Sequence, residues 1–344
     1  MAIIDKPSDY FNTKLYSGTG SSNAVTGVGF QPDWTWIKDR DTASNHMVTD
    51  AVRGATKTLY IQNADGESTV AQALKSFNTD GFTVGTDGDV NANTKNFASW
   101  NWLAGTTSGL SGGTITPSSY SINSTSGFGI YKYTGTGSAG TIASGLPSVK
   151  CFIIKALDAS GNGWVVYHQD LGTNKYLQLD ETSAPYTGTS QFNDTAPTTS
   201  STNSLISVGT AGSTNSNGRD YIMYAFSEIQ GYSKFGSYTG NGNADGTFVY
   251  TGFSPAFVLM KGTNVNGWLI IDNKRTAYNS DSKFLYPQAG DAEEALSGRF
   301  DFTSNGFKLR NSWTAFNSSG QTYIYMAFAE NPFTTSTGVP ATAR

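Results

Sequence analysis

Two short segments of the chain pair an aspartate with an arginine three residues later, Asp50 with Arg53 and Asp272 with Arg275. A carboxylate and a guanidinium at this spacing could act as an acid–base pair, or they could fix a turn through a charge-assisted hydrogen bond. The related segment at residues 168–171 lacks the pair. The pairs therefore cannot form a site that occurs three times, and we predict that they are structural turn pairs.

The residues that most often bind metals or act as nucleophiles are few and scattered. The chain has two histidines, His46 and His168, and one cysteine, Cys151, whereas a zinc site needs clustered ligands. Residues 87–89 read Asp-Gly-Asp but lack the rest of a calcium loop, so they indicate a turn. Two histidines do not support a Ser-His-Asp triad. We expect no catalytic residue, no metal and no cofactor.

Carboxylates and aromatic side chains leave two carbohydrate-related readings open. Glu228 and Glu330 follow two related strands, and paired carboxylates could cleave a glycosidic bond; their matching positions favour structural caps instead, and we predict that the protein is not an enzyme. Trp313, Tyr186 and Tyr278 lie in segments without a counterpart elsewhere in the chain. Their rings could pack against sugar rings, or they could be half-buried anchors of their loops.

Three related segments organise the chain, at residues 29–38, 145–155 and 252–261. Each begins with a turn, continues through a proline into an apolar run, and ends in a lysine. They lie about 105 to 117 residues apart, which is the size of a domain rather than of a short solenoid repeat. We predict an internal repeat of three units.

Each unit is predicted to begin and end with a strand. The closing strands at 96–102, 220–226 and 322–328 are rich in aromatic residues. Because side chains alternate between the two faces of a strand, Trp100 and Trp102 share one face. Other units have Tyr, Phe or Met at these positions, so we predict that they belong to a core rather than to a sugar-binding platform.

The expected fold is all-β, with three tandem β-sandwich or jelly-roll-like domains, because short strands alternate with turns and no convincing amphipathic helix is present. The predicted organisation is an N-terminal leader at 1–10, β domain 1 at 11–103, a Gly/Ser/Thr-rich linker at 104–126, β domain 2 at 127–230, β domain 3 at 231–333 and a C-terminal tail at 334–344.

Composition excludes several classes of function. Only 14% of the 344 residues are charged and the net charge is −4, so we expect neither a nucleic-acid surface nor membrane insertion. A single cysteine permits no disulfide within the chain. No signal peptide is visible at the start of the sequence, and we therefore expect synthesis in the cytoplasm of the producing cell.

One part of the chain resembles a known family. Residues 30–40, His46, residues 50–54, residues 80–85 and residues 100–102 resemble a domain of unknown function that is common in virion proteins of tailed phages, especially marine ones. The resemblance covers about residues 10–105, and it reaches the later units through their relation to the first. It implies a structural component of the particle, of tail-fibre, tail-associated or head-decoration type, and it brings no catalytic residues.

Residues and resemblance together suggest a non-enzymatic phage virion structural protein displayed on the particle. It would serve as a tail fibre, tail appendage or capsid decoration, and it would mediate host-surface adhesion or particle stabilisation. The expected location is the virion, and the expected partners are other capsid or tail proteins, host surface glycans and further copies of the chain. The alternative is a secreted carbohydrate-binding module or a glycan-cleaving β-sandwich enzyme.

Overall fold

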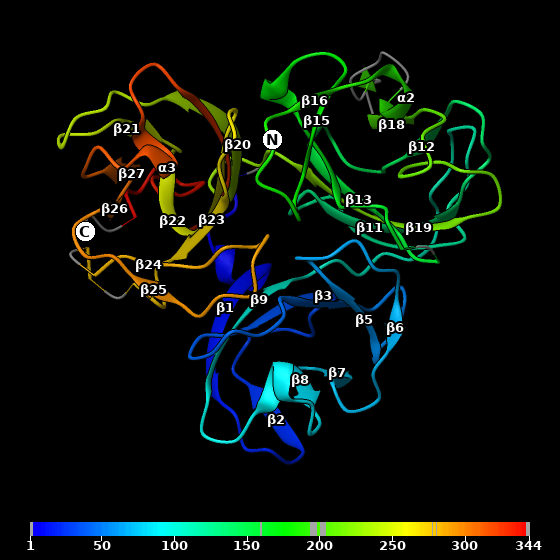
Figure 1. The fold of residues 1–344 in the computed structure, drawn as a ribbon, viewed down its shortest axis with the longest axis horizontal. Coiled ribbons are helices and arrows are strands. Elements are labelled where there is room, and N and C mark those ends of the chain that lie inside the picture. Colours follow the sequence, from blue (N-terminus) through cyan, green and yellow to red (C-terminus); the bar gives the residue numbers. More distant parts are fainter. Residues whose placement is uncertain are drawn as a thin grey trace.

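The computed structural model describes residues 3–158, 160–192, 198–199, 204–276, 278–279 and 281–341. Within these residues the chain consists mainly of antiparallel strands, with three one-turn α-helices and two 3-10 turns. Figure 1 shows the strands gathered in three lobes around a common centre. The prediction of an all-β fold of sandwich-like units is confirmed.

Lobe 1 pairs a larger and a smaller antiparallel sheet. The larger sheet has the order β1 (Phe11–Ser17), β9 (Asn96–Trp102), β3 (Trp34–Asp39), β4 (Met47–Asp50), β5 (Lys57–Tyr60), β6 (Ser68–Thr69). The smaller sheet has the order β2 (Asn23–Thr26), β8 (Gly81–Val84), β7 (Leu74–Asn78), and the lobe also holds η1 (Pro7–Asp9) and α1 (Gly88–Asn91).

Lobe 2 repeats this two-sheet arrangement. Its larger sheet has the order β10 (Ser119–Asn123), β11 (Phe128–Thr134), β19 (Asp220–Ser227), β13 (Val149–Ala156), β14 (Val165–His168), β15 (Lys175–Gln178), β16 (Tyr186–Thr187). The smaller sheet has the order β12 (Gly140–Ala143), β18 (Ser204–Val208), β17 (Thr198–Thr199), and η2 (Gln169–Leu171) and α2 (Thr189–Phe192) complete the lobe.

Lobe 3 has a shorter main sheet. The order is β20 (Ser233–Thr239), β28 (Thr322–Pro332), β22 (Phe253–Gly262), β23 (Trp268–Asp272). The second sheet runs β21 (Phe248–Tyr250), β27 (Gly306–Leu309), β26 (Phe300–Thr303), and the lobe also has the pair β24 (Lys283–Phe284) and β25 (Glu294–Ala295) and the helix α3 (Thr314–Asn317).

The closing strand is an interior strand in all three larger sheets. β9 lies between β1 and β3, β19 between β11 and β13, and β28 between β20 and β22. An interior strand that is covered on both faces needs apolar side chains in both directions, and such strands read as continuous apolar runs. This explains why residues 221–227 of β19 are all buried.

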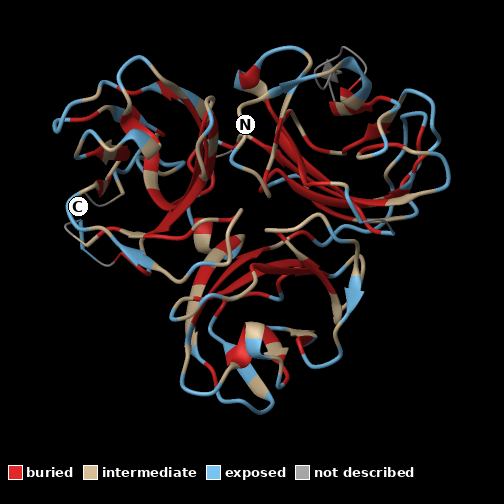
Figure 2. Cartoon of the chain, viewed as in Figure 1, coloured by how far each residue is buried: buried red, intermediate tan, exposed pale blue. Residues whose placement is uncertain are grey.

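Each larger sheet buries its two faces against different partners. One face packs on the smaller sheet of its own lobe, which gives three separate cores. The opposite faces of all three sheets meet in one further cluster, here called the central core, and Figure 2 shows buried residues along the sheets around this centre. Aromatic members of the central core include Phe11, Trp34, Trp36, Trp100 and Trp102 from lobe 1, Phe128, Trp164, Tyr224 and Phe226 from lobe 2, and Phe235, Phe257, Trp268 and Phe328 from lobe 3.

The segment 104–126, whose composition predicts a flexible or extended linker, is part of the folded lobe 2. It contributes β10, whose residues Ser119 to Asn123 pair with β11 along their full length. Ile115 and Ile122 are buried in the intersheet core of lobe 2. Two isoleucines outweigh the surrounding Gly, Ser and Thr, because burying each large aliphatic side chain stabilises by about 1.5–3 kcal/mol.

The described residues near the two ends of the chain, 3–10 and 334–341, are hydrogen-bonded to each other, and the N-terminal ones also pack against the lobes. Ile4, in the predicted leader, is buried in the central core, and its amide donates to the carbonyl of Gln230. In the tail, the Thr335 amide donates to the Val339 carbonyl, and the Ser336 amide donates to the Asp5 carboxylate at 2.6 Å. The described parts of both ends therefore belong to the folded body.

Candidate functional site

The first aspartate–arginine pair lies at the contact between lobes 1 and 2. The Arg53 Nε donates to Asp50 Oδ2 at 2.5 Å, and both side chains are almost completely buried. Tyr224, on the closing strand of lobe 2, donates its hydroxyl to the same carboxylate oxygen at 2.7 Å. Arg53 also reaches Glu67 at 3.3 Å. The pair holds its own turn and also binds the neighbouring lobe.

The second pair occupies the corresponding place between lobes 3 and 1. The Arg275 Nε donates to Asp272 Oδ2 at 2.6 Å. Trp100, on the closing strand of lobe 1, donates its indole N–H to that oxygen at 3.0 Å, and the Arg275 guanidinium lies 5.4 Å from the Trp100 ring centre. A cation above an indole face adds to the attraction between the lobes.

Glu293 extends this second contact. It accepts from Arg40 of lobe 1 at 2.8 Å and from Arg275 at 3.1 Å. Burial opposes ionisation of Glu293, but the hydrogen bonds and charges of the two arginines outweigh it and hold the pKa of the carboxyl below its usual value. The buried charges are thus compensated in the way that buried ions require.

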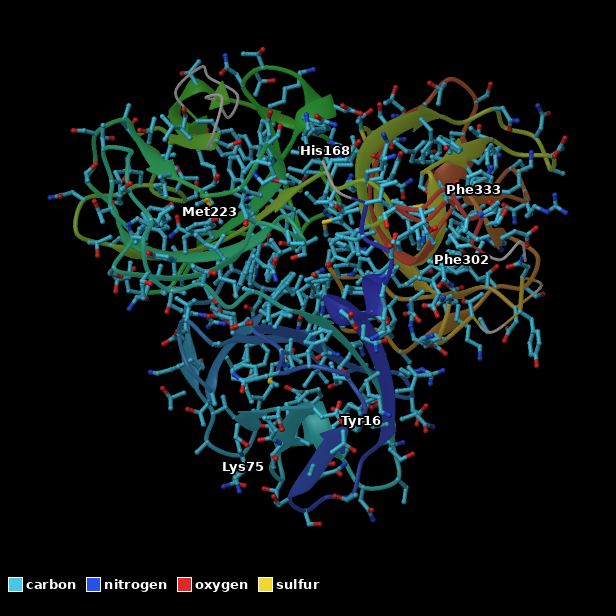
Figure 3. The ribbon with its side chains drawn as sticks, turned by 180° about the vertical axis from the view of Figure 1, so that it is seen from behind. Tyr16, Lys75, His168, Met223, Phe302 and Phe333 are labelled. Carbon is cyan, nitrogen blue, oxygen red and sulfur yellow. The ribbon has the colours of Figure 1, made fainter. Side chains whose placement is uncertain are left out.

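His168 takes the corresponding place between lobes 2 and 3, where Figure 3 shows it at the boundary of the two lobes. Its Nδ1 accepts from the Asp170 amide at 3.2 Å, which leaves the proton on Nε2 to be donated to the Tyr325 carbonyl at 3.1 Å. Burial lowers the pKa of His168 to about 4, so the ring is neutral at pH 7. The three contacts run from lobe 1 to lobe 2, from 2 to 3, and from 3 to 1.

Tryptophan side chains support the same boundaries. The Trp164 indole of lobe 2 donates to the Tyr60 carbonyl of lobe 1 at 3.0 Å, and the Trp268 indole of lobe 3 donates to the Gln178 carbonyl of lobe 2 at 2.8 Å. In lobe 1 the segment that leads into β4 carries His46, which is buried and accepts from the Trp36 indole at 3.0 Å. These groups are inaccessible to a substrate.

The three aromatic residues proposed for sugar binding have different surroundings. Trp313 is half-buried, packs edge-on against Phe284 and Phe316, and carries the Arg299 guanidinium 4.4 Å from its ring centre. This is the environment of a loop anchor. Because one face of the indole is covered by a cation, Trp313 does not offer an open platform for a sugar ring.

Tyr186 and Tyr278 are more exposed. Tyr186 stacks on Tyr176 with ring centres 5.3 Å apart and donates its hydroxyl to Glu181 at 2.6 Å. Tyr278 is 77% exposed, next to Asn279, whose amide bonds the backbone of Phe302 in both directions. Each aromatic residue has its own neighbours, and the three do not form one surface.

A groove at the junction of lobes 2 and 3 was not indicated by the sequence reading. It has a volume of about 550 Å³ and is lined by residues at the start of β13, from the connection between β19 and β20, from the start of β20, and from the end of β21 to the start of β22. Tyr250, which lines it, is 58% exposed. A sequence signal existed: Phe248 and Tyr250 flank Val249 on a short strand, and alternation places both rings on the face opposite the buried valine.

Other chemical patterns find no support among the described residues. No group of three His, Cys, Asp or Glu side chains in that part of the chain could hold a metal ion. The sequence Gly109-Leu110-Ser111-Gly112-Gly113 fits the spacing of a hydrolase nucleophile motif, but it lies in an exposed loop between β9 and β10 and not between a strand and a helix. None of the described helices is long and apolar enough to cross a membrane.

Comparisons with known proteins place the chain in one family. A family model matches it from residue 6 to residue 332. No curated protein and no solved structure matches it.

Proposed function

The chain belongs to the family described as Domain of unknown function (DUF7483), and for this member we propose a non-enzymatic structural role in a phage particle. The protein would be displayed on the virion as a tail fibre, tail appendage or capsid decoration. There it would mediate host-surface adhesion or stabilise the particle, in contact with other capsid or tail proteins. It would be made in the host cytoplasm and leave the cell within the particle.

The closed ring of contacts between the three lobes carries this proposal. Aromatic pairs cross each boundary, such as Trp34 on Tyr224 at 4.5 Å and Phe11 on Phe328 at 5.2 Å between ring centres. Pairs of this kind add about 0.5–1.5 kcal/mol each beyond the area that they bury. The three lobes therefore share one core and are not independent domains joined by linkers.

Such a body suits a protein that must persist outside a cell without cross-links. The single cysteine, Cys151, is buried and unpaired. Stability therefore comes from the shared core and from the buried Asp50–Arg53 and Asp272–Arg275 pairs. The buried aspartates and arginines join the lobes. The outer loops are therefore free for contacts with partners.

The alternative of a glycan-cleaving enzyme finds less support than that of a binding module. Glu228 pairs with Lys234 at 3.0 Å and Glu330 pairs with Lys274 at 2.8 Å, so each of these two carboxylates is engaged by its own lysine. The exposed tyrosine in the junction groove favours carbohydrate binding as a second candidate function.

Mass spectrometry of purified particles from the source culture tests the structural role. We expect the chain at a stoichiometry comparable to that of known capsid or tail proteins. Cryo-electron microscopy without imposed head symmetry would then place it on the capsid lattice or on the tail. Absence from purified particles, with the protein recovered only in the soluble fraction, would contradict the proposal.

A further inference from the structure

The junction groove lies where the chain passes from lobe 2 to lobe 3. Its volume of about 550 Å³ falls in the range of small-molecule sites, about 300–1,000 Å³. The residues that matter for its chemistry are Lys150, Glu228, Gln230, Lys234 and Tyr250. The groove is thus a mixed surface with one aromatic ring and several polar side chains.

The turn that follows the aromatic wall of the groove is held by backbone hydrogen bonds. A side chain at Gly252, where φ is +83°, would contact the ring of Tyr250, so the ring lies across the glycine. The amides of Thr251 and Gly252 both donate to the Asn305 carbonyl, at 3.0 and 3.2 Å. Because backbone bonds hold this turn, the backbone that carries Tyr250 needs little ordering when a ligand binds.

Lys150 reaches the groove because of an irregularity in β13. The pairing of β13 with β19 shifts register between Val149 and Cys151, which leaves Lys150 as the extra residue of a bulge. Bulges redirect the side chain of the extra residue and often lie beside functional sites. Lys150 is half-buried, and it makes no ion pair with the described residues.

The remaining polar groups complete a weakly cationic surface. Lys234 is paired with Glu228 at 3.0 Å, and Gln230 is exposed. Two lysines and one glutamate give the lining a charge of +1, whereas the whole chain carries −4. An anionic group is therefore favoured in this groove over a cationic one.

We propose that the junction groove binds an acidic saccharide. The Tyr250 ring would pack against the C–H face of a pyranose, Lys150 would bind its carboxylate or sulfate through a charge-assisted hydrogen bond, and Gln230 and Glu228 would bond its hydroxyls. This inference rests on the proposed role in host-surface adhesion and names the class of glycan that would be recognised.

Titration calorimetry on the full chain with tetragalacturonic acid, its fully methyl-esterified form and a chondroitin sulfate tetrasaccharide tests the assignment. We expect at least one of the acidic saccharides to bind and the ester to bind at least about tenfold more weakly, since the ester keeps the rings but lacks the charge. Lys150→Ala should reduce affinity for the acid by about tenfold and abolish the preference over the ester.

Tyr250→Ala should weaken binding at least about fivefold through loss of the ring, and Tyr250→Phe should retain it. Phe248→Ala is the matched control: Phe248 lies on the same strand, is 45% exposed and does not line the groove, so its removal should leave affinity unchanged. Tyr250→Ala, Tyr250→Phe and Phe248→Ala should have the melting temperature of the wild type, because both side chains are exposed.

Failure of both acidic saccharides to bind the wild type would overturn the assignment, and so would binding that survives Tyr250→Ala and Lys150→Ala. Either result would leave the structural role untouched, because that role is tested by the presence of the chain in particles. Conversely, saccharide binding by a protein that is absent from particles would support the groove and contradict the virion role.

Discussion

The Tyr224 hydroxyl donates to Asp50 Oδ2 at 2.7 Å and accepts from Arg53 at 3.4 Å, so it joins the closing strand of lobe 2 to the first buried ion pair of lobe 1. Trp100 bonds Asp272 in the same way from lobe 1 to lobe 3. The aspartates thus serve two purposes, since each accepts from its own arginine and from an aromatic donor of the next lobe. The lobes are expected to unfold together rather than one after another.

Replacing Tyr224 with phenylalanine removes only the hydroxyl at this boundary. Since a buried charged acceptor then loses a donor, we expect the free energy of unfolding to fall by about 1.5–3 kcal/mol. Chemical denaturation followed by tryptophan fluorescence measures the change. Tyr133→Phe is the control, because that hydroxyl bonds a neutral carbonyl within lobe 2 and should cost about 0.5–1.5 kcal/mol. Equal losses in both variants would argue against a special role of the boundary.

The Asp272–Arg275 pair should behave as a coupled unit. Asp272→Ala leaves the buried Arg275 guanidinium with only Glu293 of its two carboxylate partners and removes the acceptor of the Trp100 indole, and we expect a loss of about 3–5 kcal/mol. The double variant Asp272→Ala with Arg275→Met should lose less than the sum of the two single changes, because neither charge is then left alone. Thermal unfolding of the four proteins gives the coupling energy.

A more exposed ion pair is the control for the variants at Asp272 and Arg275. Lys274 lies next to the buried pair in sequence but bonds Glu330 near the surface. Lys274→Ala should therefore change stability by no more than about 1 kcal/mol. Strict additivity at Asp272 and Arg275 would show that the two side chains do not act together.

Trp268 tests the central core. Its side chain is 3% exposed and its indole donates across the boundary to Gln178 of lobe 2. Trp268→Ala should lower the free energy of unfolding by about 3–5 kcal/mol, because it leaves a large cavity and an unpaired carbonyl. A change near zero in a denaturation experiment would refute this placement.

The sequence indicates which side chains of the closing strand of lobe 1 are buried. It does not indicate which residues of the other lobes pack against them. Alternation predicts that Trp100 and Trp102 share a face and belong to a core, and both are fully buried. Besides rings of their own lobe, their partners include Phe128 of lobe 2 and Phe257 and Phe328 of lobe 3. A pattern along one strand cannot identify a surface that lies more than a hundred residues away.

Local irregularities were equally hard to predict. The second of the three related segments, residues 145–155, has one residue more than the others, and the structure shows a register shift at Lys150. The extra residue redirects one lysine into the junction groove. Composition misled at residues 104–126, where two buried isoleucines outweigh many flexible residues. The bulge and the folded segment each depend on one or two side chains, whereas composition and periodicity describe the average character of a segment.

Lys261 makes stability depend on pH in a defined direction. Its ammonium is buried and donates to the carbonyls of Gly262 and Asn264 and, across the boundary, of Thr182. Burial lowers its pKa to about 8, whereas the unfolded chain titrates near the ordinary lysine value of about 10.4. Between these values the unfolded state holds a proton that the folded state has lost, so the free energy of unfolding rises with pH. Below pH 8 both states are protonated and the burial penalty is present in full.

The comparison of wild type with Lys261→Met isolates this titration, because Lys38, Lys155 and the buried tyrosines titrate equally in both proteins. We expect the difference in the free energy of unfolding, wild type minus variant, to increase from pH 8 to pH 10 with a slope of up to about 1.4 kcal/mol per pH unit. Urea denaturation at pH 6, 7, 8, 9 and 10 provides the values. The difference should be level between pH 6 and 7, where Lys261 is charged in both states. A difference that is level over the whole range would mean that the folded protein keeps Lys261 hydrated and ordinary in its pKa.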